Sequence, residues 1–290
     1  MAKYIGTYAN SGDVQTALNE QELNRPFIAY TIDNEEVIFG AAADRAEVGD
    51  IVVYSTGDTL LHYIKQADYS ASTYPVADYV PVGVVAYPQN DDMFSGVTGE
   101  VTFMGLNWLD RTKPDSGNSN DTTGMIWGYN GFDIPELTNY ANSGTAITDM
   151  NGKSNTQAVI QYATAQTDWH TASAITNDDV EGSYPLFECS WRYHTSGTSQ
   201  GDWYIPSCGQ VMLLATNETA LQNLNYSFSA LNASIYTFQS AGNKRRATST
   251  ERDGSRAWRY AEKGYPEVDN KNGTTTFTAR PYCSKLMTRI

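Results

Sequence analysis

The most constraining feature of this sequence is the stretch 201–214, GDWYIPSCGQVMLL. Trp203 and Tyr204 favour a β-strand, and Pro206 ends that strand because its nitrogen has no hydrogen to donate. Ser207, with Gln210 three residues later, forms the S-x-x-Q pattern of a capping box, which marks the first turn of a helix. The stretch therefore predicts a strand that stops sharply and continues as a helix with apolar residues behind its cap.

The elements predicted around this corner are strands before it, helices on both sides of it and short strands after it. Apolar residues at helical spacing predict helices at about 154–165, 185–193 and 218–231, and the first of these carries a second S-x-x-Q pattern at Ser154. Strands are expected at 51–55, 59–64, 80–88, 99–108, 235–240, 245–251, 257–262 and 275–286. This order, without an internal repeat, favours an α+β fold.

The chain divides into three predicted segments. Residues 1–40 form an N-terminal attachment unit, with a helix from Ser11 to about Asn24 followed by an extended pair around Asp33. A unit of this size cannot bury a core alone, so it must pack on the body or on another chain. Residues 41–111 are β-rich and form either a separate domain or the first strands of the body. Residues 112–290 begin with a polar, turn-rich stretch and an aromatic cluster at Trp127, Tyr129 and Phe132.

The charge of the chain is unevenly distributed. The formal net charge is −14, but from Lys244 onward eleven Lys and Arg residues oppose five Asp and Glu residues, which leaves this part at +6 and the rest at −20. Two alternatives remain open: the basic part is neutralised against the acidic body, or it forms an anion-binding face for acidic glycans. The acidic body argues against nucleic-acid binding, because phosphate would be repelled.

Cysteine and leader patterns add further expectations. Cys189, Cys208 and Cys283 lie far apart without a CxxC motif, which predicts neither a disulfide framework nor a zinc site. The opening sequence has no basic segment followed by an apolar run, and no stretch of 18 apolar residues occurs, so neither a signal peptide nor a membrane span is predicted. We expect folding in a cytoplasm, and no metal or other cofactor.

Catalytic patterns are also missing from the sequence. His62, His170 and His194 lie outside any nucleophile or metal motif. Adjacent acids such as Asp91–Asp92 and Asp178–Asp179 are typical of solvated surface, and the separation of two carboxylates in space cannot be inferred from sequence spacing. We predict that the protein is not an enzyme, with a glycan depolymerase as the alternative.

Four phrases carry a resemblance to a known fold. They are NGKSNTQAVI (151–160), the corner at 201–214, ATSTERDGSRAW (247–258) and ARPYCSKL (279–286). In this order they resemble the C-type-lectin-like domains of the Legionella collagen-like adhesin C-terminal domain family, which implies that fold, with short strands and two or three helices, for 112–290. The EPN or QPD loop and the WND strand of calcium-dependent lectins are missing, and so is the close cysteine pair of formylglycine-generating enzymes.

A second resemblance covers the N-terminal part. The segments 4–30, 49–55, 80–90 and 105–110 resemble virion structural and fibre proteins of tailed phages that infect gut Bacteroidetes, including crAss-like phages. The resemblance implies a virion protein assembled in the host cytoplasm, attached to other virion proteins through residues 1–40 and forming a homo-oligomer, most simply a trimer. A purely architectural capsid, neck or fibre component and a bacterial surface adhesin are the alternatives.

Candidate binding residues come from the last strands, which in this fold commonly present the ligand surface. The phrase DGSRAWRY (253–260) resembles the SGSRA-type phrase of variable regions in related phage and bacterial proteins. Cationic forks and flat rings suit sugar stacking and the capture of acidic groups on a host-surface or mucin glycan. The alternatives are a core position for the tryptophan and a structural ion pair for the first arginine. The candidates are Arg256, Trp258, Tyr260, Lys263 and Tyr265.

Overall fold

The chain forms two compact units in the computed structural model. The first spans Met1–Ala46, and the second, called the body below, contains Glu47–Thr288. The structure describes residues 4–8, 27–31, 36–40, 45–70, 78–88, 100–121, 124–166, 173–238, 245–260, 265–273 and 277–290.

The N-terminal unit contains a three-stranded sheet in the order β1 (Tyr4–Tyr8), β2 (Phe27–Thr31), β3 (Glu36–Gly40). The antiparallel pairing of β2 with β3 confirms the extended pair predicted around Asp33. Strand β1 was not predicted, and it pairs parallel to β2. A parallel pair needs a crossover of about a dozen residues or more, usually a helix. The helix predicted from Ser11 lies in that connection, outside the described residues.

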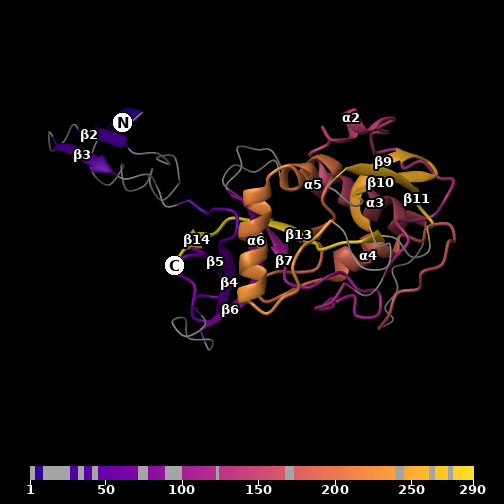
Figure 1. Ribbon diagram of the computed structural model, residues 1–290, viewed down its shortest axis with the longest axis horizontal. Helices are drawn as coiled ribbons and strands as arrows, with labels where there is room; N and C mark the ends of the chain where they lie inside the picture. The colour runs from indigo at the N-terminus through magenta and orange to yellow at the C-terminus, as the bar shows by residue number, and fades with distance from the viewer. Residues whose placement is uncertain are drawn as a thin grey trace. The chain divides into compact units, whose positions relative to one another are not determined.

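The larger sheet of the body has seven strands in the order β14-β5-β4-β6-β7-β13-β8. Cys283 in β13 pairs with Phe103 in β7 on one side and with Trp203 in β8 on the other. The strands between residues 51 and 105 therefore share one sheet with strands from the end of the chain (Figure 1). The strands are β4 (Ile51–Ser55), β5 (Leu61–Ile64), β6 (Tyr79–Tyr87), β7 (Val101–Gly105), β8 (Trp203–Tyr204), β13 (Tyr282–Lys285) and β14 (Thr288–Arg289).

The second sheet has four strands in the order β11-β10-β9-β12. Helices α3 (Gly152–Gln166) and α5 (Cys208–Ala215) contact β9, and α3 also contacts β8 in the larger sheet, so the helices join the two sheets. The strands are β9 (Arg245–Asp253), β10 (Arg256–Tyr260), β11 (Pro266–Asn270) and β12 (Phe277–Thr278). The body is therefore a mixed α+β fold with two sheets, as predicted.

The helices predicted within the body are present, with one strand prediction wrong. Helices α4 (Pro185–Arg192) and α6 (Glu218–Ala230) match the predicted ranges, and a short α2 (Ser143–Ala146) was not predicted. No strand forms in the described part of the segment predicted at 235–240. The Asn225 side chain, on α6, accepts a hydrogen bond from Tyr236 N at 2.7 Å and donates to Tyr236 O at 2.9 Å, so a side chain takes the place of a strand partner.

The corner at 201–214 has the predicted form. Strand β8 ends before Pro206, α5 begins at Cys208, and Ser207 N donates to Gln210 Oε1 at 2.9 Å. The Ser207 hydroxyl donates to Asp149 O at 2.6 Å, which links the corner to the segment before α3. Helix α3 begins at Gly152, two residues before the predicted Ser154. A Cβ at Gly152 would lie only 2.8 Å from Ser207 N. Glycine there lets α3 approach the corner closely.

No helix in the described ranges is both long and apolar enough to cross a membrane.

Candidate functional site

The four predicted site residues that the structure describes do not gather at one place. Arg256 lies at the turn between β9 and β10, opposite Asp253 and Asn270, whereas Tyr260 lies opposite Pro266 at the other end of the strand. A strand rises by about 3.3 Å per residue, so these ends are about 13 Å apart. Tyr265, 66% exposed, adjoins the far end, and Lys263 lies outside the described residues.

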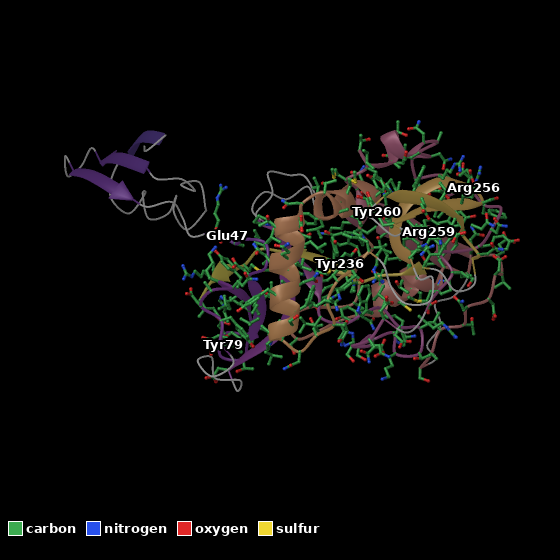
Figure 2. The ribbon with its side chains drawn as sticks, viewed as in Figure 1. Glu47, Tyr79, Tyr236, Arg256, Arg259 and Tyr260 are labelled. Carbon is green, nitrogen blue, oxygen red and sulfur yellow. The ribbon has the colours of Figure 1, made fainter. Side chains whose placement is uncertain are left out.

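Trp258 and Tyr260 belong to the core of the body. Trp258 is 4% exposed and donates its indole N–H to Tyr140 O at 2.8 Å. Tyr260 is fully buried and donates its hydroxyl to Cys208 O at 2.9 Å. Their rings pack β10 against α5 and do not reach solvent, which is the core alternative considered for Trp258. Figure 2 shows Arg256 at the outer margin of the body and Tyr260 further inside.

Arg256 is the predicted site residue that reaches solvent at the turn. Its side chain is 43% exposed and its Nη2 lies 2.5 Å from Asp253 Oδ2. Partial burial opposes ionisation of Asp253, but hydrogen bonds from Arg256 and from Ser255 N outweigh it and lower the pKa of this carboxyl. The turn thus presents a fixed, exposed pair of opposite charges, as the structural-pair alternative predicted, and both groups can still hydrogen-bond a ligand.

A fully buried ion pair lies below this turn. Lys271 Nζ contacts Glu251 Oε1, and both side chains are 0% exposed. Lys271 Nζ also donates to Phe132 O at 2.7 Å and lies 5.0 Å from the centre of the Trp127 ring. Burial raises the pKa of Glu251 to about 7 although Lys271 opposes the shift, and burial lowers the pKa of Lys271. The pair joins β9, the end of β11 and the loop that carries Phe132.

The pKa of Glu251 predicts a pH dependence of stability. Between the ordinary carboxyl pKa of 4.5 and about 7, the folded protein holds a proton that the unfolded chain releases. The contribution of this group to the free energy of unfolding is therefore complete below the ordinary pKa and is lost as pH rises through about 7. We expect the wild-type advantage over Glu251→Gln, measured by urea unfolding at constant ionic strength, to shrink from pH 5 to pH 8. A constant or growing advantage would contradict this titration.

Three other basic residues of the C-terminal part pair with carboxylates within the body. Arg246 pairs with Asp121 at 2.5 Å, Arg259 with Asp269 at 2.5 Å and Lys285 with Asp202 at 2.7 Å. Arg280 is also buried, with its guanidinium centred 4.7 Å from the Trp108 ring and 3.9 Å from the Phe228 ring. Burial lowers the pKa of Arg280 to about 9. These contacts favour internal neutralisation over a continuous anion-binding face.

A loop that was not assigned to the site covers the β9–β10 turn. Gly131 N donates to Gly254 O at 2.9 Å, and Asn130 N donates to Asp179 Oδ1 at 3.1 Å. Asn272 Nδ2 donates to the other oxygen of Asp179 at 2.7 Å. The aromatic cluster at 127–132 was visible in the sequence, but nothing local linked it to the last strands. We call the resulting surface the tip; it comprises residues 129–133, 178–181, 253–256 and 270–273.

Other chemically active side chains are held in structural contacts. His62 Nε2 lies 2.8 Å from Asp58 Oδ2, and His194 Nδ1 lies 3.0 Å from Arg192 O. His170 and the pair Asp91–Asp92 lie outside the described residues. Cys189, Cys208 and Cys283 are buried free thiols whose pKa values are raised by burial. Within the described ranges, no group of three or more His, Cys, Asp or Glu residues could hold a metal ion.

Comparison with known proteins yields one likeness. No family model and no curated protein matches the chain. Among solved structures, the chain is similar to a fimbrial protein from Bacteroides ovatus, with 15% sequence identity and a TM-score of 0.47 over 88% of this chain. The match covers 52% of that protein, so the present chain spans about half its length. The lectin-like and phage resemblances therefore remain predictions.

Proposed function

We propose that this protein is a structural component of a tailed-phage virion, in a fibre-like appendage whose body binds a host-surface or mucin glycan. The observation that carries the proposal is the partly exposed pair of Arg256 and Asp253 at the tip, at the end of a hairpin whose residues 246–251 are buried. A rigid turn that offers donors and acceptors in fixed positions loses little entropy when it binds a ligand.

Attachment to the particle is assigned to residues 1–40. This segment lies within a compact unit separate from the body, which fits a division between docking and recognition. A three-stranded sheet is near the lower limit of independent stability, so the unit gains from a partner. Other virion proteins or further copies of the chain, most simply in a trimer, would supply that partner.

A purely architectural role is the second candidate. The observation that favours it is the internal pairing of Arg246, Arg259 and Lys285, which engages these three cations within the body. In that case the body would fill a place in the particle without a ligand of its own.

A glycan array separates the two roles. We expect the full chain to bind at least one host-surface or mucin glycan, and Arg256→Gln to weaken that binding by about tenfold or more, because a charge-assisted hydrogen bond is worth roughly 1.5–3 kcal/mol. Arg289→Gln, on the exposed strand β14, is the matched control and should leave binding unchanged. Absence of binding at high valency would favour the architectural role. Mass spectrometry of purified particles tests both, because a protein missing from the virion would leave the adhesin alternative.

A further inference from the structure

Two aromatic rings stand beside the charged pair of the tip. Phe132 is 38% exposed, and Tyr129 is partly exposed. Their ring centres are 5.5 Å apart, and the ring planes are inclined by 41°. Neither ring is fully buried, whereas Trp127, two residues before Tyr129, is. Resting on the proposed function, we propose that Tyr129 and Phe132 form a stacking subsite for a neutral hexopyranose.

Three hydrogen bonds hold the backbone that carries these rings. Phe132 O accepts from Lys271 Nζ at 2.7 Å, and the buried contact with Glu251 fixes that lysine. Gly131 N and Asn130 N are bound to Gly254 O and to the Asp179 carboxylate. The platform is therefore formed before any ligand arrives, and aromatic side chains have few rotamers to lose.

The loop that carries the rings contacts segments with the polar groups that sugar recognition needs. One face of a pyranose ring is lined by C–H groups and can lie on an aromatic face, while its hydroxyls both donate and accept hydrogen bonds. The Asp253 carboxylate and the Arg256 guanidinium offer an acceptor and donors on the turn that packs against Gly131. Asp179 and Asn272 offer the same on the other side of the loop.

The charge of the tip selects a neutral sugar over an acidic one. The tip contains five carboxylates, and its cations are Arg256 and Lys271, the latter neutralised by Glu251 below the surface. Arg252, just outside the tip, adds a third cation, with its Nε 3.9 Å from Asp253 Oδ2. With Arg252 counted, the difference is three negative charges, which would repel a uronate, sialate or sulfate group. The carboxylates are Asp133, Asp178, Asp179, Glu181 and Asp253. This selection differs from the acidic-glycan alternative drawn from the sequence, because Arg246, Arg259 and Lys285 pair with carboxylates elsewhere in the body.

The test uses the full chain and immobilised mucin, both intact and after removal of sialic acid and sulfate. We expect treated mucin to bind at least as tightly as intact mucin. Phe132→Ala should weaken binding to treated mucin about tenfold, in line with about 1.4 kcal/mol for one stacked ring. Phe132→Trp should retain binding, since a stacking face is kept. Tyr226→Ala, which removes a 67% exposed ring from α6, is the matched control and should change nothing.

Each outcome bears on a separate claim. If the wild type binds, Phe132→Ala binds equally well and the two proteins have the same thermal stability, the stacking subsite would be overturned but not the proposed function. Tighter binding to intact than to treated mucin would overturn the neutral-sugar assignment. Absence of wild-type binding to every glycan on the array would overturn the proposed binding function and the subsite together.

Discussion

Replacing Lys271 by methionine is expected to lower the free energy of unfolding by about 3–5 kcal/mol, because it leaves Glu251 buried without its partner. Both side chains are fully buried, and Lys271 Nζ has a second acceptor in Phe132 O, so the variant loses two contacts of one charged group. For a chain of this size a loss of that magnitude corresponds to roughly 10 °C in the unfolding midpoint. Urea unfolding at pH 8, where Glu251 is ionised, measures the effect.

Two further variants make this result specific to the buried pair. Lys285→Met removes a lysine of the same type from a pair that is 35% and 25% exposed, and should cost under about 1 kcal/mol because solvent screens the charges. The double variant Lys271→Met with Glu251→Met should recover most of the lost stability, since apolar residues often replace a buried pair at little cost. If Lys271→Met and Lys285→Met lower the free energy of unfolding equally, burial does not increase the contribution of an ion pair to the stability of this protein.

The elements that were predicted correctly are those with a local signal. The corner at 201–214 contains its own strand, proline stop and helix cap, and α4 and α6 contain apolar residues at helical spacing. A local signal failed where a distant group competed with it. Ser154 has the right spacing for a cap, but its hydroxyl donates to Asn151 O because the helix begins at Gly152 to meet the corner. The predicted strand at 235–240 was likewise displaced by the side chain of Asn225.

The candidate site was only partly predictable for the same reason. The sequence identified the turn at 253–256, but the groups that complete the tip come from distant parts of the chain. Phe132 O and Lys271 Nζ are separated by 139 residues, and Asn272 and Asp179 by 93. No periodicity or spacing reports such a contact. Resemblance and residue chemistry placed Trp258 among the candidates without showing that its side of β10 is covered, because α5 reaches this sheet from another part of the chain.

Replacing Gly209 by alanine is expected to lower the free energy of unfolding by about 2–3 kcal/mol, because the added methyl group overlaps backbone that cannot rotate away. A Cβ at this position would lie 2.6 Å from Ile147 O and closer still to Asp149 O. Helix α5 would have to move away from the segment before α3. That movement would break the hydrogen bonds that Gly209 N, at 2.9 Å, and Ser207 Oγ, at 2.6 Å, donate to Asp149 O.

The control is a helical glycine at which an added methyl group meets no backbone. Gly144 lies in the exposed helix α2, where an added Cβ would meet only Asn142 Oδ1 at 3.4 Å. Gly144→Ala should therefore be neutral or should stabilise by up to about 1 kcal/mol through helix propensity alone. The same propensity gain acts at Gly209, so the difference between the two variants in urea unfolding reports the steric overlap. If the two variants have equal free energies of unfolding, α5 can move away from residues 147–149 at no cost. If Gly209→Ala is the less stable variant, the contact between α5 and residues 147–149 holds the corner in place. Because α5 also contacts β9, that contact then helps to position β9 beneath the tip.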